Sequence, residues 1–239
     1  MKNINVVVFA EDFEIMETFK KVFEKKLDSL RSEVESHEYY KFRWKLGEVF
    51  TILAKGGDRL LQLLNDYYEN GCLNNLIVKP LKNGMADVVF VIILHDKDKE
   101  SKIGKAVEDV FERFLKSLDK KIRSKIRIRK RALGGPLPIK SFNISKEFET
   151  YFLINEIKKN KLSKNELARY CELIENNQKV KACLLFYLKQ ILKYKDKPSI
   201  RIYLEKHLHK ENELCEKLAN EFYINEIVCE ITQKSLMIL

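Results

Sequence analysis

The chain contains 239 residues, of which 45% are hydrophobic and 33% are charged, so it can bury a core and remain soluble. No stretch reaches the roughly 18 uncharged apolar residues of a membrane-spanning helix. The five cysteines show no C-x-x-C spacing, which argues against a disulfide or zinc framework. A net charge of +10 favours a polyanionic partner, nucleic acid above all, although a lysine-rich surface of the kind found in proteins from hot environments gives the same excess.

The first element is a short continuous apolar run at residues 4–9, INVVVF, which predicts a buried strand. Glu11 and Asp12 follow it and interrupt the apolar run too early for a signal peptide, so we expect a cytoplasmic protein that does not engage a membrane. Residues 13–30 then place hydrophobic side chains at helical spacing. The first strand therefore ends in a carboxylate and continues directly into a helix.

Residues 31–45 mix charged and aromatic side chains and are interpreted as a loop, whose aromatic residues either cover the core or stack on nucleic-acid bases. Residues 48–54 predict the next strand, and Gly56 and Gly57 separate it from a helix expected over residues 58–68. A glycine pair at this position lets the backbone approach closely and lets a helix N-terminus face an anion.

Residues 70–84 are rich in turn-forming residues, with one short strand expected at residues 76–78. Residues 88–94 are all apolar and predict a strand buried on both faces, as in parallel sheets. Asp96 and Asp98 follow it, and two carboxylates at i and i+2 of an extended chain point the same way. They repel each other unless a cation lies between them, and Mg²⁺ or Mn²⁺ suits such oxygen ligands. A solvated loop after the strand is the alternative.

A helix expected over residues 104–118 is followed by the alternating segment IRSKIRIRKR at residues 122–131. A period of two predicts a strand with one apolar and one cationic face. Same-face residues lie roughly 6.6 Å apart, similar to the phosphate spacing along one nucleic-acid strand. The predicted nucleic-acid-binding residues are those of the cationic face, namely Arg123, Lys125, Arg127, Arg129 and Arg131. An edge strand that uses charge to prevent edge-to-edge pairing is the alternative.

Strands alternate with helices up to residue 131, which predicts an α/β fold with a parallel-rich sheet flanked by helices. The glycine- and proline-rich segment at residues 133–138 marks the expected boundary. It separates an α/β domain over residues 1–132 from a helical C-terminal region over residues 145–239 that packs on it. Within that region, helical spacing recurs over residues 146–159, 164–175, 178–194, 198–208 and 211–223, and the apolar tail at 224–239 is a helix or a strand.

Three strand ends thus carry candidate functional residues: Glu11, the Gly56-Gly57 pair and the Asp96/Asp98 pair. An isolated glutamate, a glycine-marked second turn and an Asp-x-Asp motif together resemble the Toprim domain of topoisomerases, primases and related nucleases. The matching segments are VVVFAED at 6–12, TILAKGGDRLLQLL at 51–64 and VVFVIILHDKDKE at 88–100. The likeness is strongest to small archaeal and bacterial Toprim-like proteins of unknown function and to Toprim nucleases of phage-exclusion type, and it extends loosely to the helical tail.

The resemblance implies a role for each acidic residue. Glu11 would be a general acid/base or a metal ligand, Asp96 and Asp98 would hold Mg²⁺, and Glu100 is a possible third acid. This agrees with the chemistry, because phosphoryl transfer needs a divalent cation to neutralise charge and a carboxylate to move a proton. We expect Glu11 and Asp96 to lie within about 10 Å of each other, since one ion bridges no larger gap.

Two functions are compatible with these residues. The first is Mg²⁺-dependent phosphodiester chemistry on DNA or RNA, most simply by a nuclease. The second is a non-catalytic nucleic-acid-binding or interaction protein on a Toprim-like scaffold. Asp12 stands where the family usually has glycine, and Lys97 and Lys99 alternate with the acids, and these departures favour the second function. Neither function fixes how many copies of the chain assemble.

Overall fold

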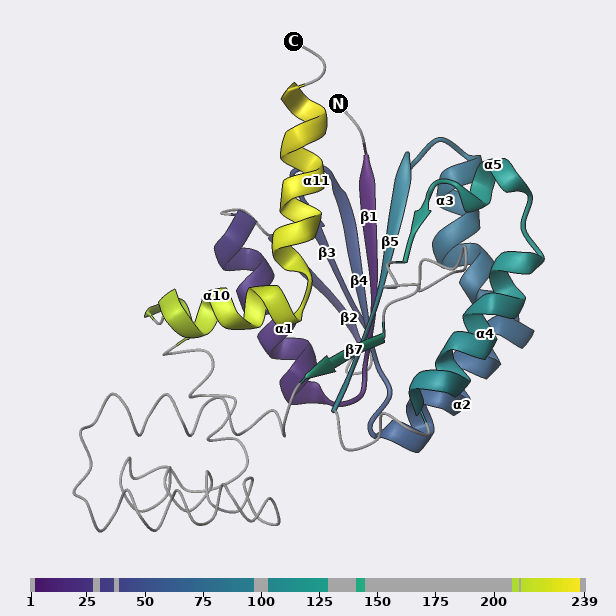
Figure 1. Ribbon diagram of the computed structural model, residues 1–239, viewed down its shortest axis with the longest axis horizontal. Helices are drawn as coiled ribbons and strands as arrows, with labels where there is room; N and C mark the ends of the chain where they lie inside the picture. Colours follow the sequence, from purple (N-terminus) through teal and green to yellow (C-terminus); the bar gives the residue numbers. More distant parts are fainter. Residues whose placement is uncertain are drawn as a thin grey trace.

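The computed structural model describes residues 3–27, 31–36, 39–96, 103–128, 141–144, 208–210 and 212–236. Within these ranges the chain forms one mixed β-sheet with helices on both faces, the α/β architecture predicted from the sequence (Figure 1). None of the helices in these ranges is long and apolar enough to cross a membrane.

The sheet contains seven described strands in the order β2-β3-β4-β1-β5-β6, with β7 also paired to β5. Their bounds are β1 (Ile4–Ala10), β2 (Arg31–Ser36), β3 (Tyr39–Trp44), β4 (Gly47–Leu53), β5 (Val88–Asp96), β6 (Ile126–Arg127) and β7 (Ser141–Ile144). The pairs β1–β4, β1–β5, β5–β6 and β5–β7 are parallel, whereas β2–β3 and β3–β4 are antiparallel. The predicted parallel-rich sheet is therefore confirmed, with an antiparallel hairpin added at one side.

Helices cover the two faces of the sheet in two groups. One face carries α1 (Phe13–Leu27), α10 (Asn212–Glu221), α11 (Ile224–Leu236) and the short 3₁₀ turn η4 (Leu208–Lys210). The other carries α2 (Gly57–Glu69), the π-helix η1 (Asn74–Val78), α3 (Lys79–Lys82), α4 (Lys105–Lys116) and α5 (Lys120–Arg123). Each of the helices predicted over residues 13–30, 58–68, 104–118 and 211–223 is present in its described residues, and residues 224–236 of the apolar tail form a helix.

The strand β1 is buried on both faces, as its continuous apolar sequence predicts. Val6, Val8 and Ala10 face the α1 side, while Val7 and Phe9 face the α2 side. Each fully buried side chain of this kind contributes about 1.5–3 kcal/mol relative to exposure. β1 therefore joins the two hydrophobic clusters and fixes the strands on either side of it.

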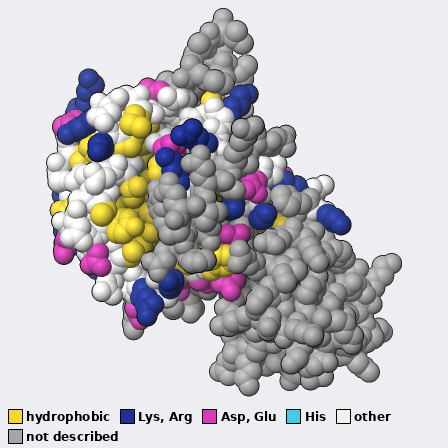
Figure 2. All heavy atoms as spheres, turned by 180° about the vertical axis from the view of Figure 1, so that it is seen from behind, with side chains coloured by type: hydrophobic (Ala, Val, Ile, Leu, Met, Phe, Trp, Pro, Cys, Tyr) yellow, Lys and Arg dark blue, Asp and Glu magenta, His cyan; other side chains and the backbone are white. Residues whose placement is uncertain are grey.

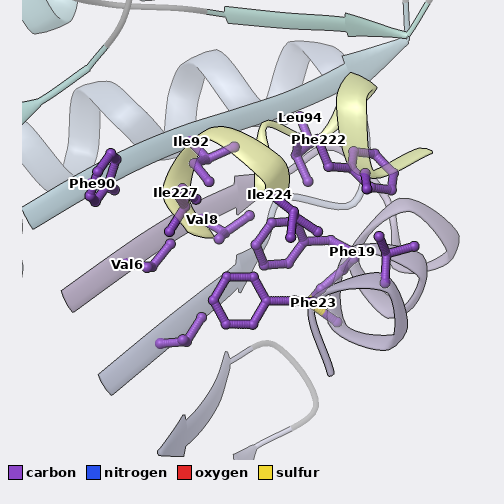
Figure 3. Packing of buried hydrophobic residues seen from close by; sticks show 14 of the residues in the cluster. Val6, Val8, Phe19, Phe23, Phe90, Ile92, Leu94, Phe222, Ile224 and Ile227 are labelled. Atoms are coloured by element: carbon purple, nitrogen blue, oxygen red, sulfur yellow. The ribbon is translucent and has the colours of Figure 1, made fainter. Parts of the chain in front are cut away.

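The C-terminal helices complete the first of these clusters. Phe19 of α1 meets Phe222 with ring centroids 6.1 Å apart, and Phe23 meets Trp44 of β3 at 5.4 Å. Figure 3 shows the packing, with labels on Val6, Val8, Phe19, Phe23, Phe90, Ile92, Leu94, Phe222, Ile224 and Ile227. Residues more than 190 positions apart thus share one core, and α10 and α11 belong to the same packed unit as β1.

The prediction of a loop at residues 31–45 is wrong, because this segment forms the hairpin of β2 and β3. Phe42 and Trp44 of β3 are buried in the α1 cluster, whereas Lys41 and Arg43 lie near Glu48 on the other face of the strand. These side chains alternate as a half-buried strand requires. The dense charges hid this period in the sequence.

The prediction of one continuous strand over residues 122–131 is also wrong. Asp119 caps the short helix α5, since its Oδ1 accepts a hydrogen bond of 2.8 Å from Ile122 N. Arg123 therefore lies in a helix, and only Ile126 and Arg127 form strand β6. Ile122 and Ile126 also fit the i, i+4 spacing of a helix, and Ile126 and Ile128 fit a strand, so a period of two arose from a helix followed by a strand.

Two further expectations concern smaller segments. Residues 76–78 lie in the π-helix η1 and not in a strand. The segment 133–138 and the helices predicted over residues 146–159, 164–175 and 178–194 lie outside the described residues, as does all but the last residue of the helix predicted over 198–208. Because β7 begins at Ser141 and pairs with β5, the sheet extends past the expected boundary at residue 132, and the division into two domains stays a prediction.

Candidate active site

The carboxyl ends of β1, β4 and β5 meet at one end of the sheet, because the three strands are adjacent and parallel. Ala10 of β1 pairs with Leu53 on one side and with Leu94 on the other. The pairing continues one residue further, since Glu11 N donates to Leu94 O at 2.9 Å and Gly56 N donates to Glu11 O at 2.7 Å. The backbone of Glu11 is thereby held from both sides.

Two buried polar residues, Glu11 and His95, lie at this end of the sheet. Continuing the register by one residue places them on neighbouring strands, about 4.8 Å apart. Only 4% of Glu11 and none of His95 is exposed. By strand alternation both continue the side of the sheet occupied by Phe9 and Ile93, which faces α2 and α4. No role was predicted for His95, although a histidine that ends a seven-residue apolar run is visible in the sequence.

Asp96 is the last residue of β5, one residue beyond His95. The register puts its Cα about 6 Å from that of Glu11, inside the expected 10 Å. Asp98 and Glu100 lie outside the described residues. The side chains of Asp96, Asp98 and Glu100 are not among those described. Among the side chains that are described, no group of three His, Cys, Asp or Glu residues is placed to hold a metal ion. The shared cation therefore stays a prediction.

The turn between β4 and α2 brings a helix N-terminus to the same end of the sheet. Lys55 and Gly56 have positive φ angles of 62° and 131°, and Gly56 caps α2 without a side-chain hydrogen bond. A Cβ atom on Gly56 would meet no atom within 4 Å, so its φ angle and not crowding favours glycine there. The free N–H groups of the first turn and the helix dipole favour an anion at this point.

Asp12, the departure from the Toprim pattern, has a structural role. Its Oδ1 accepts a hydrogen bond of 2.9 Å from Ile15 N, and its carbonyl oxygen accepts one of 3.2 Å from Met16 N. Asp12 is thus the N-cap residue of α1, a position that favours aspartate. A negative charge there also interacts well with the helix dipole.

The predicted cationic residues do not form one strand face. Arg123 is exposed on α5, Lys125 is half-buried, and Nε of Arg127 lies 3.4 Å from Oε1 of Glu230 on α11. Arg123 and Lys125 precede β6, so they lie about 20 Å along the strand direction from Glu11, at the amino end of the sheet. Arg129 and Arg131 lie outside the described residues.

No family model and no curated protein matches this sequence. Among solved structures, the chain is similar to a hypothetical protein from Pyrococcus horikoshii OT3, with a TM-score of 0.53, 16% identity and coverage of 96% of this chain and 99% of that one. The chain also matches a futalosine hydrolase mutant of Helicobacter pylori strain 26695, with a TM-score of 0.22, 7% identity and coverage of 39% of this chain and 36% of that one. It matches a Campylobacter jejuni nucleosidase for 5'-methylthioadenosine and S-adenosyl homocysteine with a TM-score of 0.20, 12% identity and coverage of 39% and 33%. Both matches are too weak to carry an argument. What the chain shares along almost its whole length with the Pyrococcus protein is therefore the fold.

Proposed function

We propose that this protein performs metal-dependent phosphodiester chemistry on nucleic acid, most simply as a nuclease with a Toprim-like site at the carboxyl end of the sheet. One observation carries the proposal. β1 and β5 are adjacent and parallel, with Ala10 paired to Leu94, so Glu11 and Asp96 leave neighbouring strands at the same end of the sheet. In this proposal Glu11 and the first aspartate of the Asp-x-Asp motif share one cation beyond the ends of the two strands.

The donor chemistry fits a hard divalent cation. Carboxylate oxygens of Glu11, Asp96 and Asp98 would hold Mg²⁺ or Mn²⁺, with Glu100 as the third acid of the segment after β5. A metal bound there would neutralise charge on a phosphate group. The N-terminus of α2, which begins beside the Glu11 carbonyl, would bind a phosphate oxygen through its first-turn N–H groups.

The chain's own residues supply position and proton transfer. Backbone hydrogen bonds to Leu94 and from Gly56 fix the main chain of Glu11, so its carboxylate is presented from a rigid strand end. In this proposal Glu11 binds the metal or takes a proton from the attacking water. His95 takes the neighbouring position on β5 and is fully buried.

A nucleic-acid-binding protein without turnover is the second candidate. The observation that favours it is the position of the exposed cationic residues of α5, which lie at the amino end of the sheet and away from the acidic residues. Such a surface binds a polyanion without any metal. The two candidates differ in whether Asp96 and Asp98 bind a divalent cation.

The test is a Mn²⁺ titration of the full chain, followed by cleavage assays on labelled DNA and RNA. Asp96→Asn should lower Mn²⁺ affinity by about tenfold or more and abolish cleavage, because loss of a ligand costs at least as much as loss of a group that only orients one. The metal-free variant should be at least as stable as the wild type, because one of several neighbouring carboxylates is neutralised. Asp66→Asn, an exposed change on α2, is the matched control and should alter neither property. Cleavage by Asp96→Asn at the wild-type rate would contradict the proposal.

A further inference from the structure

The described cationic residues differ in their partners. Several lie within 4.0 Å of a carboxylate, as in Lys26–Glu216, Lys41–Glu48, Lys116–Glu112 and Arg127–Glu230. Five others share both a location and the lack of an ion pair with the part of the chain that the structure describes. These exposed residues are Lys79, Lys82, Lys120, Lys121 and Arg123, which we call the amino-end patch.

The topology gathers these five residues at one end of the sheet. α3 leads into β5 and α5 leads into β6, and because β5 and β6 are adjacent and parallel, both short helices lie at the amino end. Leu81 of α3 and Ile122 of α5 insert into the same hydrophobic cluster. In Figure 1 the two helices lie together at the upper right. Seen from behind in Figure 2, several Lys and Arg side chains lie at the corresponding upper left, with Asp or Glu side chains among them.

The carboxylates within these segments are committed to backbone groups. Oδ2 of Asp87 accepts a hydrogen bond of 2.9 Å from Asn3 N. Oδ1 of Asp119 accepts one of 2.8 Å from Ile122 N. The five cations of the patch thus outnumber the two carboxylates in these segments, one of which joins β1 to β5 while the other caps α5. A concentration of one charge sign on a surface attracts a partner of the opposite sign.

An exposed apolar side chain lies within the same surface. Met85 is 59% exposed and is the one large exposed hydrophobic residue among those described. It lies in the turn between α3 and β5, and the turn is fixed by a hydrogen bond of 2.9 Å from Met85 N to Pro80 O. Nucleic acid offers apolar sugar and base surfaces between its phosphates, whereas an isolated phosphate offers none. An exposed methionine at the same end of the sheet as the five cations therefore fits a nucleic acid.

We propose that the amino-end patch is a nucleic-acid-binding surface that holds the sugar–phosphate backbone without a metal ion. It is separate from the proposed metal site, because β5 has nine residues and spans about 26 Å between the two ends of the sheet. The inference requires no chemistry at Glu11 or Asp96. It assigns a binding role to α3 and to two lysines of α5 that lie outside the alternating segment, and it excludes Arg127, whose partner is Glu230.

The experiment measures binding of the full chain to a 20-base-pair DNA duplex by fluorescence anisotropy, in EDTA and at several KCl concentrations. The patch variant replaces Lys82, Lys120 and Lys121 with Gln. The control variant replaces the exposed lysines Lys105, Lys210 and Lys217 with Gln, which removes the same charge from other surfaces. The patch variant should lose about tenfold or more in affinity, and its slope of log affinity against log salt should fall by about 2.7, or about 0.9 for each lost contact. The control should stay within about twofold of the wild type, because dispersed charges contribute little at a Debye length of about 10 Å.

Two results would overturn the inference, provided that circular dichroism shows both variants to be folded. One is an unchanged affinity and salt slope in the patch variant. The other is displacement of the duplex by polyglutamate at equal charge concentration, which would assign the patch to an acidic protein surface. Because EDTA removes any divalent cation, the binding assay does not depend on the metal site, so failure of the metal-site proposal leaves this result intact.

Discussion

The two ends of the sheet differ in how they hold their charged groups. At the carboxyl end, Glu11 is almost completely buried and its backbone is fixed between β4 and β5. At the amino end, the charges of Lys82, Lys120 and Lys121 stand on short surface helices in contact with solvent. The first arrangement suits chemistry, which depends on the position of a group to within a fraction of an ångström. The second suits electrostatic attraction, which acts over a distance and tolerates side-chain movement.

In the two proposals, reaction and attraction thus belong to opposite ends of one sheet. A charge placed beside Glu11 changes the environment of every group there, whereas a lysine on α5 can be exchanged without moving a strand. We therefore expect changes at the carboxyl end to alter turnover and changes at the amino end to alter affinity.

The largest effect is expected from Glu11→Gln. The change keeps the size of the side chain but removes its charge, so cleavage should fall by about 10³-fold, within the range for loss of a general base or metal ligand. Affinity for a duplex in EDTA should stay at the wild-type value. Single-turnover cleavage and anisotropy on the same preparation measure the two quantities, and Glu69→Gln, at the far end of α2, is the control. A parallel loss of affinity would show that the two ends of the sheet do not act separately.

A second effect is expected from the length of the nucleic acid. The two ends of the sheet lie about 26 Å apart along β5, and a duplex covers this distance with about eight base pairs at 3.4 Å each. Duplexes shorter than this cannot touch both ends, so their KM should rise by about tenfold while kcat stays constant, as for loss of uniform binding. Steady-state kinetics over a series from about 6 to about 20 base pairs measures the break. A KM that is independent of length would mean that the patch does not guide the substrate.

The elements that the sequence predicted correctly are those whose pattern reports burial directly. β1 and β5 are continuous apolar runs, and α2 and α4 have one apolar face, so each could be assigned without knowledge of its neighbours. The strand β3 was not predicted, because its exposed face carries two charged residues, Lys41 and Arg43, that pair with Glu48. The register that brings Glu11 beside His95 depends on strand order, which no local pattern contains.

At residues 122–131 the error was the opposite one, because a clear alternating pattern predicted a strand where the chain forms a helix followed by a short strand. The Asp119 cap starts a helix that removes Arg123 from the predicted strand face. Among the described residues of this segment, the alternation holds only at residues 126–128, with Ile126 and Ile128 in the core and Arg127 directed to Glu230 on α11. An ion pair between residues 103 positions apart cannot be read from local periodicity, and neither can the grouping of the five cations in the amino-end patch.

The smallest effect is expected at Asp12, which belongs to the carboxyl end but not to its proposed chemistry. Asp12→Ala removes the acceptor for Ile15 N and should lower the free energy of unfolding by about 1 kcal/mol, as for other N-caps. Asp12→Gly should cost only a few tenths of a kcal/mol, because glycine is tolerated at an N-cap. If Asp12 only caps α1, both variants should keep the Mn²⁺ affinity of the wild type within about twofold, since the charge they remove is directed to a helix N-terminus. Urea unfolding and Mn²⁺ titration of the two variants, with Asp12→Asn as the capping control, measure both quantities. A several-fold rise in Mn²⁺ affinity in Asp12→Gly alone would show that aspartate at this position weakens the metal site, and a loss in all three variants would make Asp12 a ligand.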